Sequence, residues 1–265
     1  MKKTYVITGS TSGIGKVLLT KLADGNIVFA GYRNEKYKKD LVEVGAIPFF
    51  IDMEDSQSIK DAAQFIKSQT DKIDTLFNVA GCVIAGIMEI LPPEKIKKQF
   101  DINTFSHIEF TQNLLPNVDK VINISSMASF GIFPFISPYC ASKRALDILF
   151  NAMTLESDLK VISIKPGVIA TPLWRKSIEL NQDSIENCSG YEKQMNYLVG
   201  NAQRNGGRGL TAEQAADFVI KINNLKNPKS SYTIGLDAKL AELFSKLPLT
   251  LQNKIVKLGM KLRVK

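Results

Sequence analysis

Seven short runs of β-branched and apolar residues recur along the chain, and most of the segments between them have the 3.6-residue period of amphipathic helices. The runs cover residues 4–8, 27–32, 47–51, 75–79, 120–125, 160–165 and 231–234. Strands that alternate with helices in this way form a parallel sheet with helices on both faces. The pattern therefore predicts an α/β fold with a doubly wound parallel sheet of about seven strands.

The alternation is interrupted once and ends before the chain does. Polar residues, aromatic residues and glycines gather at 172–209, and we expect this segment to be a mobile insertion over a ligand site. Residues 236–265 form a basic extension that reads as two amphipathic helices separated by Pro248. With 265 residues and 45% hydrophobic content, the rest can bury one sizeable core, so a single domain is predicted.

Composition argues against several classes of protein. The formal charge is +8, but the lysines are scattered along the chain, which argues against a nucleic-acid partner. Cys82, Cys140 and Cys188 are widely spaced, so neither a disulfide framework nor a metal site is expected. No apolar run approaches the roughly 18 residues that span a bilayer, and the first residues resemble neither a signal peptide nor an anchor. We expect a reducing, cytoplasmic setting.

A glycine-rich turn follows the first predicted strand. Residues 8–15 read TGSTSGIG and lead into a helix-like segment. Glycines there permit a tight turn and the close approach of a pyrophosphate, which the N-terminus of a helix favours. A plain structural turn is the alternative for glycines alone, and the position between a first strand and a first helix favours the phosphate site.

The spacing TGxxxGxG resembles that of the short-chain dehydrogenase/reductase family, and further family motifs occur in the expected order between Lys2 and about Ile234. They are Asp52, Asn78-Val79-Ala80-Gly81, Asn103, Ser125-Ser126, Tyr139 with Lys143, and Pro166-Gly167 with Thr171. Val79 departs from the pattern, which more often has a second asparagine, and we expect only local repacking there. The resemblance implies that residues 1–235 are a Rossmann-type dinucleotide-binding and catalytic domain of an NAD(P)-dependent oxidoreductase (EC 1.1.1.-).

Tyr139 and Lys143 lie four residues apart, so a helix would place them on one face. A nearby ammonium and the positive ring of an oxidised nicotinamide would lower the pKa of the phenol from about 10. The resemblance implies that Tyr139 is the general acid and base, and that Lys143 also binds the nicotinamide ribose. It also implies that Ser126, with Ser125 as the competing candidate, stabilises the substrate oxygen, and that Asn103 holds a water linked to Lys143. An isolated YxxxK would otherwise indicate only an amphipathic surface helix.

The choice of cofactor depends on the end of the second strand. Enzymes that use NAD usually have an acid there, whereas this chain has Tyr32 followed by Arg33, whose guanidinium can pair with a phosphate. NADP(H) is therefore predicted over NAD(H), although Glu35 lies two residues further on. The family pattern places Asp52 against the adenine with Met53 packed on the ring. The other predicted cofactor contacts are Gly9, Ser10, Thr11, Ser12, Gly13, Ile14, Gly15, Asn78, Ala80, Gly81, Tyr139, Lys143, Pro166, Gly167, Val168 and Thr171.

The predicted substrate walls are mostly apolar and aromatic. They come from residues 83–87, 128–135 and the insertion with Trp174, Tyr191 and Met195, and the predicted substrate contacts are Ser126, Phe133 and Trp174. Such a lining suits a hydrophobic carbonyl or alcohol. The run SFGIFPFISPYCASKRAL is similar to the branch that contains hydroxysteroid and retinol dehydrogenases, which implies a lipid-, steroid- or retinoid-like substrate.

Two surfaces suggest partners. The helix predicted over 139–155 is apolar nearly all round, so a second subunit is expected to cover the side that the sheet does not, in a homodimer or homotetramer. For the basic C-terminal tail we favour packing on the core or on a partner subunit over peripheral contact with a membrane surface.

Two other functions use a similar fold. A non-catalytic NADP(H)-binding redox sensor that binds a partner does not need Ser126, Tyr139 or Lys143, and this chain has all three. A sugar-nucleotide epimerase usually has a different glycine spacing and a larger C-terminal domain. Both are weaker interpretations than an oxidoreductase.

Overall fold

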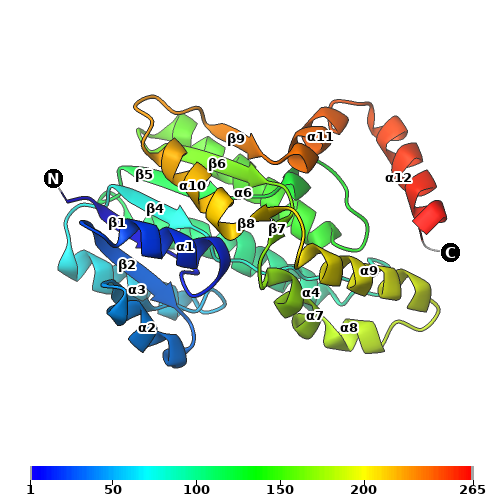
Figure 1. Ribbon diagram of the computed structural model, residues 1–265, viewed down its shortest axis with the longest axis horizontal. Helices are drawn as coiled ribbons and strands as arrows, with labels where there is room; N and C mark the ends of the chain where they lie inside the picture. Colours follow the sequence, from blue (N-terminus) through cyan, green and yellow to red (C-terminus); the bar gives the residue numbers. More distant parts are fainter. Residues whose placement is uncertain (1, 264–265) are drawn as a thin grey trace.

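The computed structural model describes residues 2–263, and within them seven strands form one parallel sheet in the order β3-β2-β1-β4-β5-β6-β9 (Figure 1). Each strand coincides with one of the seven predicted runs to within a residue or two at its ends, so the predicted fold class is confirmed. The strands are β1 (Thr4–Ile7), β2 (Ile27–Tyr32), β3 (Ile47–Phe50), β4 (Thr75–Asn78), β5 (Lys120–Ile124), β6 (Lys160–Pro166) and β9 (Ser231–Ile234).

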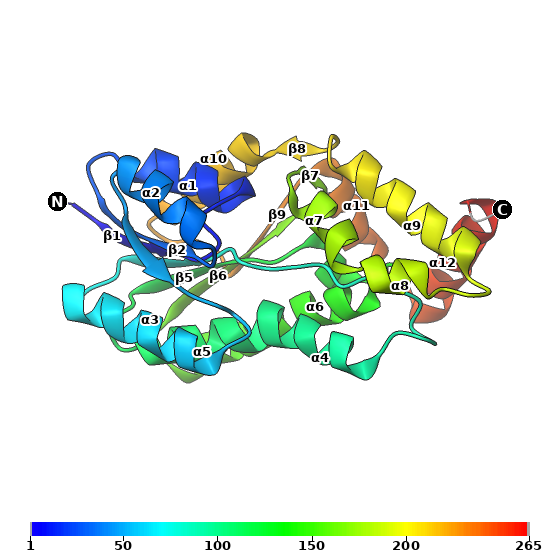
Figure 2. The ribbon, with the colours of Figure 1, turned by 90° about the horizontal axis from the view of Figure 1, so that it is seen from below.

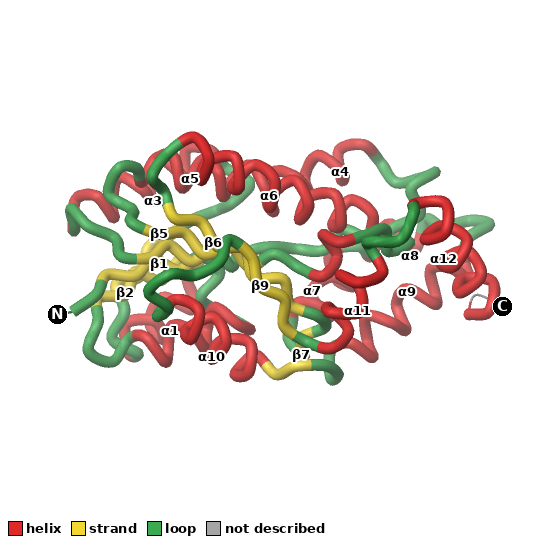
Figure 3. The backbone as a smooth tube through the Cα atoms, turned by 90° about the horizontal axis from the view of Figure 1, so that it is seen from above, coloured by secondary structure: helices red, strands yellow, loops and turns green. Residues whose placement is uncertain are grey.

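Helices cover both faces of the sheet (Figures 2 and 3). One face carries α1 (Gly13–Leu22), α2 (Lys38–Glu43) and α10 (Ala212–Asn223). The opposite face carries α3 (Ser56–Gln69), α4 (Pro93–Phe100), α5 (Ser106–Leu114) and α6 (Ser137–Glu156).

Two buried clusters form the core, one on each face of the sheet. Successive residues of a strand point to opposite faces, so Val6 of β1 packs in one cluster with Phe110 and Phe150, whereas Tyr5 and Ile7 pack in the other. Burial on both faces explains why the strands read as nearly continuous apolar runs.

The strand order reverses between β1 and β4. From β1 the chain continues outward to β2 and β3, and then returns to β4 on the other side of β1 and continues to β5, β6 and β9. In parallel sheets of this kind, ligands bind in the crevice beyond the carboxyl ends of the strands at such a reversal. The topology therefore places the predicted glycine turn, which follows β1, at the ligand crevice.

The segment 172–209 folds as three helices, α7 (Leu173–Leu180), α8 (Gln182–Glu186) and α9 (Glu192–Asn205). Its two ends are held together, because β7 (Ile169–Ala170) pairs with β8 (Leu210–Thr211). The expected mobility of this segment stays a prediction.

Two helices, α11 (Leu236–Phe244) and α12 (Leu249–Arg263), follow β9 and lie at the same end of the molecule as α7–α9 (Figures 1 and 3). The chain turns between them near Pro248, where the sequence predicts the break. No helix in the described range 2–263 is both long enough and apolar enough to cross a membrane.

Candidate active site

The glycine turn packs tightly against its surroundings. Gly9 and Gly13 have φ angles of 66° and 54°, which side chains rarely adopt. A Cβ on Gly9 would lie 2.9 Å from the backbone nitrogen of Ala80, and a Cβ on Gly15 only 2.3 Å from the Gly9 carbonyl oxygen. The turn thus leaves the N-terminus of α1 without side chains in front of it, which fits the pyrophosphate of a dinucleotide.

Two hydroxyl groups hold this turn in place. Thr8 Oγ1 accepts hydrogen bonds from the backbone nitrogens of Val79 (2.9 Å) and Ala80 (3.1 Å), and Ser10 Oγ donates to the Gly31 carbonyl at 2.7 Å. Ser10 is fully buried, and its hydroxyl is bonded within the protein. The predicted contact of Ser10 with a cofactor stays a prediction. Thr8 is not among the predicted cofactor contacts, although its hydroxyl at the end of a strand was the available signal.

The remaining predicted residues of the turn have different surroundings. Thr11, Ser12 and Gly13 are partly exposed at the crevice, whereas Ile14 packs on the core cluster beneath α1. Gly13 faces Thr171, because a Cβ on Gly13 would lie 3.3 Å from Thr171 Cγ2. The predicted contacts after β1 and after β6 therefore meet across the crevice.

Asn78, the last residue of β4, and Gly81, three residues later, face different parts of the molecule. Asn78 Nδ2 donates to Asn123 Oδ1 at 2.9 Å, which links β4 to β5 inside the sheet. Gly81 instead lies near Lys143, since a Cβ on Gly81 would be 3.8 Å from Lys143 Nζ. The side chain of Asn78 thus supports the sheet, and Ala80 and Gly81 form the floor of the crevice.

Tyr139, Lys143 and Ser126 come together beyond the carboxyl end of β5. Tyr139 and Lys143 share one face of α6, and Ser126 begins the 3₁₀ turn η3 (Met127–Phe130). Ser126 Oγ accepts from Ala128 N at 3.1 Å and also shares a hydrogen bond with Tyr139. Lys143 is buried, and its Nζ donates to the Ile124 carbonyl at 2.8 Å. Ser125 is buried, and its hydroxyl has no partner among residues 2–263.

Asn103 sits in a π-helical turn, η2 (Asp101–Phe105), between α4 and α5. Its amide is bonded at both ends to one residue, because Oδ1 accepts from Cys82 N at 2.9 Å and Nδ2 donates to Cys82 O at 2.9 Å. Nδ2 also lies 3.3 Å from Ser142 Oγ. Single π-turns inside helices frequently mark functional sites. The water that Asn103 is expected to hold stays a prediction.

Burial controls the proton affinities at this site. Burial raises the pKa of Tyr139 to about 12, and the hydrogen bond with Ser126 opposes the shift. Burial also lowers the pKa of Lys143 to about 8, although the negative charge of Asp147 acts to raise it. In the structure desolvation is the largest cause and shifts this pKa upward, while Lys143 is bonded to Ile124. The expected lowering, which also needs the positive ring of an oxidised nicotinamide, stays a prediction. The phenol is therefore protonated at neutral pH and can donate.

Neither of the residues at the end of β2, Tyr32 and Arg33, is acidic. The Tyr32 hydroxyl donates to Glu35 Oε1 at 2.9 Å, and the exposed Arg33 Nη1 donates to Glu54 Oε1 at 3.3 Å. Arg33 Nη1 is also 4.0 Å from Asp52 Oδ1. Exposed pairs of this kind contribute little, so a phosphate can replace Glu54 as the partner of the guanidinium. Asp52 lies beside Arg33, and Met53, next to it, is buried.

The loop after β6 is anchored from the C-terminal side. Asp237 Oδ2 accepts from Val168 N at 2.7 Å, and a Cβ on Gly167 would lie 1.9 Å from Asp237 Oδ1. Gly167 is thus required by close packing against this carboxylate. Asp237 is not among the predicted site residues, because no local pattern indicates a contact between residues that are 69 positions apart, as Val168 and Asp237 are.

A cavity of about 820 Å³ lies at the end of the molecule that α7–α9, α11 and α12 surround, and Ser126, a predicted substrate contact, is not among the residues that line it. Phe133 and Trp174 line it as predicted, together with Val83, Ala85 and Met127, the neighbour of Ser126. Tyr191 and Met195, which were also expected in its wall, pack instead with Ile87 and Cys188. The walls that the sequence did not predict come from the C-terminal helices: Asp237, Leu240, Ala241, Phe244, Ile255, Val256, Gly259 and Met260.

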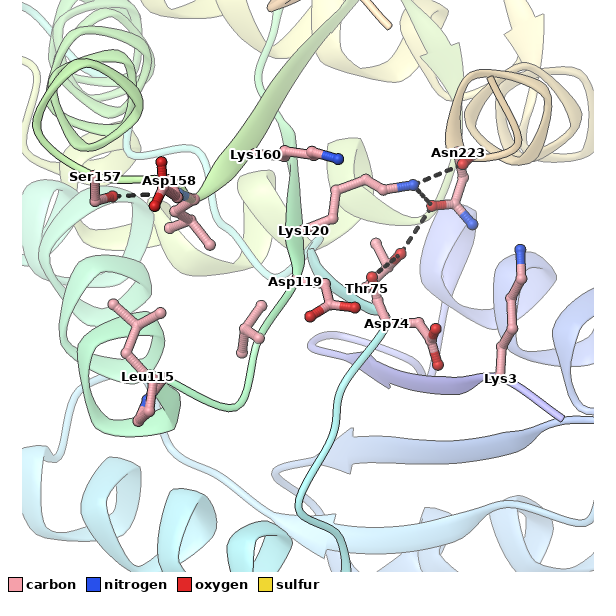
Figure 4. Close-up of a pocket in the computed structure, with 13 residues that line it drawn as sticks. Lys3, Asp74, Thr75, Leu115, Asp119, Lys120, Ser157, Asp158, Lys160 and Asn223 are labelled. Carbon is pink, nitrogen blue, oxygen red and sulfur yellow. Dashed lines mark hydrogen bonds between the residues drawn. The ribbon is translucent and has the colours of Figure 1, made fainter. Parts of the chain in front are cut away.

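A second hollow of about 670 Å³ lies at the opposite, amino-terminal edge of the sheet (Figure 4). Its charged side chains include both signs, and Lys120 Nζ is bonded to the carbonyl (2.7 Å) and the side-chain oxygen (3.0 Å) of Asn223. None of the predicted site residues lines it.

Comparison with known proteins agrees with this arrangement. The sequence profile described as "short chain dehydrogenase" matches residues 3–182, more than half of the chain. The chain is 29% identical to an uncharacterized oxidoreductase, YusZ, of Bacillus subtilis over 263 residues, which cover 93% of this chain and 94% of the relative.

Two other relatives carry the names of reductases. The NADPH-dependent 3-dehydrocapnine reductase of Ornithobacterium rhinotracheale is 32% identical over 65% of this chain and 67% of its own. The 3-ketodihydrosphingosine reductase of Bacteroides thetaiotaomicron is 27% identical over 87% of each chain.

Solved structures share the fold. A short-chain dehydrogenase from Streptomyces avermitilis superposes with a TM-score of 0.75 at 22% identity, over 98% of this chain and 95% of its own. A short-chain dehydrogenase/reductase from Burkholderia phymatum in complex with NAD superposes with a TM-score of 0.76 at 18% identity, over 87% of this chain and 88% of its own. The chain therefore belongs to the short-chain dehydrogenase/reductase family and is an NAD(P)-dependent oxidoreductase.

Proposed function

We propose that this enzyme reduces the carbonyl group of a hydrophobic, lipid-like substrate with NADPH. The observation that carries the proposal is the cavity of about 820 Å³, whose walls are largely apolar and aromatic and include Met127, the neighbour of Ser126. A volume of this size suits a ligand with a long or bulky apolar part.

The polar groups in the cavity wall are mostly engaged elsewhere. Ser177 Oγ and Asn181 Nδ2 both donate to the Val83 carbonyl, at 3.1 and 2.9 Å, and Asn181 Oδ1 accepts from Ala85 N at 2.9 Å. Asp237 is bonded to the backbone of Val168. Because these groups are already satisfied, they offer little to a sugar or a charged acid, and the wall favours an apolar substrate.

Two relatives support a lipid-like substrate by their names, the 3-dehydrocapnine reductase and the 3-ketodihydrosphingosine reductase. A steroid- or retinoid-like substrate, as the similarity of residues 129–146 to the hydroxysteroid and retinol branch implies, belongs to the same hydrophobic class.

In the proposed reaction, bound NADPH supplies the hydride. Tyr139, protonated at neutral pH because burial raises its pKa to about 12, donates its proton to the carbonyl oxygen. Ser126 Oγ donates a hydrogen bond to the same oxygen and stabilises the negative charge that develops there. Lys143 binds the ribose of the cofactor, and Asn103 holds a water beside it. Ser126, Tyr139 and Lys143 support catalysis over a non-catalytic redox sensor, which would need none of them.

The preference for NADP(H) rests on Arg33. Its guanidinium is exposed at the end of β2, where an acid would repel a 2′-phosphate, and its present partner is an exposed carboxylate of Glu54. One relative is named as NADPH-dependent, whereas the Burkholderia phymatum structure contains NAD, so the preference needs a direct test.

The outer face of α6 supports assembly. Ile148, Leu149 and Leu155 are exposed there by 55%, 39% and 81%, and burial of such side chains against a second copy would stabilise a homodimer or homotetramer. We propose a cytoplasmic homo-oligomer.

A chain-length series tests the function. Purified enzyme is assayed for NADPH oxidation with methyl ketones and 3-keto amphiphiles of increasing alkyl length, and also with steroid and sugar ketones. The proposal predicts that KM falls as the alkyl chain grows, and that Ile178→Asn in the cavity wall weakens this dependence while NADPH binding is unchanged. Equal KM for short and long chains, or activity confined to sugars, contradicts the lipid-like substrate. Tight NADPH binding without turnover of any compound favours the redox sensor.

A further inference from the structure

The C-terminal helices α11 and α12 expose an apolar surface that the reaction does not explain. Its residues lie between 37% and 80% exposed in the described structure: Leu236, Leu240, Leu243, Leu247, Leu251, Ile255, Leu258 and Leu262. We propose that this docking surface binds the headgroup region of an anionic lipid bilayer and holds the mouth of the cavity against it.

The positions of these side chains form one stripe along α11 and the turn after it, and a second along α12. Leu236, Leu240, Leu243 and Leu247 follow the spacing i, i+4, i+7, i+11, and the second set, 251, 255, 258 and 262, repeats it. Residues with this spacing lie along one face of a helix. Contiguous exposed leucines on a monomer indicate a contact with a partner or a membrane.

The inner face of α12 is already used, so the stripe cannot turn inward. Val256 and Met260 face the cavity. Gln252 Nε2 donates to the carbonyls of Leu247 (2.7 Å) and Ser245 (3.2 Å), which fixes the start of α12 to the end of α11. Most of the stripe therefore faces away from the protein in the folded state, and Leu240 and Ile255 also reach the cavity wall.

Charge identifies the occupant. Lys254, Lys257 and Lys261 lie on a third face of α12, next to the leucine stripe, and none of the three has an ion pair within residues 2–263. Glu242 is the last acid in the sequence, and residues 243–265 contain Lys246, Lys254, Lys257, Lys261, Arg263 and Lys265. Two copies of such a segment would repel each other, whereas anionic lipid headgroups attract a helix with an apolar face flanked by lysines.

The docking surface is continuous with the cavity. Leu240 and Ile255 belong both to the exposed stripes and to the cavity wall. An amphiphile can therefore pass from the bilayer into the cavity with its alkyl chain in contact with apolar side chains throughout. This last step rests on the proposed function, whereas the docking itself does not.

Vesicle flotation of the full-length protein tests the docking without any measurement of activity. The probes are vesicles of phosphatidylcholine alone and of phosphatidylcholine mixed with phosphatidylglycerol. One variant combines Lys254→Glu, Lys257→Glu and Lys261→Glu, and its control combines Lys221→Glu, Lys226→Glu and Lys229→Glu, which changes the net charge equally at exposed positions near α10. A second variant combines Leu251→Asn, Leu258→Asn and Leu262→Asn, none of which lines the cavity. NADPH affinity and circular dichroism verify that each variant folds.

We expect wild type and the α10 control to float with anionic vesicles but not with phosphatidylcholine alone. The lysine variant should lose about a hundredfold in partition coefficient, because each of its three lysines contributes roughly fivefold near an anionic surface. The leucine variant should lose binding as well, because it removes the apolar face that enters the bilayer. Folded wild type that does not float with anionic vesicles overturns the proposal. Flotation that survives in both α12 variants overturns it too. If the leucine variant instead has a lower oligomeric state in solution than wild type has, the surface is an interface between copies and not a lipid-docking surface.

Discussion

The buried ammonium of Lys143 destabilises the fold in a pH-dependent way. Burial lowers its pKa from 10.5 to about 8, so the unfolded state binds more protons between these values and wild-type stability rises with pH through this window. From these two values, the charge costs roughly 3 kcal/mol at pH 7 and about 1.5 kcal/mol at pH 9.5. Lys143→Met removes this cost and leaves the Ile124 carbonyl without its donor, which costs about 1–3 kcal/mol at any pH.

The prediction concerns the difference between the two proteins, because the lost hydrogen bond cancels when two pH values are compared. The free energy of unfolding of Lys143→Met minus that of wild type should fall by about 2 kcal/mol from pH 7 to pH 9.5. Urea unfolding of cofactor-free protein at both pH values measures it. Lys221→Met, which removes an exposed lysine of α10, should show almost no such change. If the difference for Lys143→Met stays constant within about 0.5 kcal/mol, the native ammonium is well solvated and the reasoning is refuted.

Three further predictions concern the cofactor turn, the cofactor and the substrate oxygen. Gly15→Ala should destabilise the protein by about 2 kcal/mol or more, because its Cβ meets the Gly9 carbonyl, whereas Gly207→Ala, which has open space around it, should be nearly neutral in thermal unfolding. Arg33→Glu should weaken NADPH binding by about 10- to 100-fold in titration calorimetry, with NADH affinity retained; equal losses for both would contradict the role of Arg33. Ser126→Ala should lower kcat by about 10²- to 10³-fold at unchanged NADPH affinity, while Ser125→Ala should retain most of the activity.

Local patterns predicted the sheet, and they predicted that Tyr139 and Lys143 share one helix face, because both depend on short-range spacing. The five central strands are largely buried runs, and the turn at Gly9 and Gly13 needs positive φ angles that glycine favours. Tyr139 and Lys143 meet because they are four residues apart on one helix. In these cases the residues that interact are neighbours in the sequence or follow a strand end whose position the topology determines.

The substrate end of the site was not predictable in the same way. Asp237 supports the loop at Val168, and Phe244, Ile255 and Met260 form a wall of the cavity. All of them lie in residues 236–265, which the sequence predicts as an extension of the domain. Their roles depend on how α11 and α12 fold back over the site, which no local spacing specifies. The upward shift of the Tyr139 pKa in the structure could not be predicted from spacing either, since it comes from burial.

The central claim is that Tyr139 donates the proton in a carbonyl reduction, and Tyr139→Phe tests it most directly. The phenyl ring keeps the packing of α6 and removes only the hydroxyl group. Single-turnover reduction of a hydrophobic ketone by bound NADPH is compared in wild type and variant, together with NADPH affinity. The account predicts unchanged affinity and a rate lower by at least about 10³-fold. A variant that binds NADPH normally and reduces the ketone within about tenfold of the wild-type rate would contradict it.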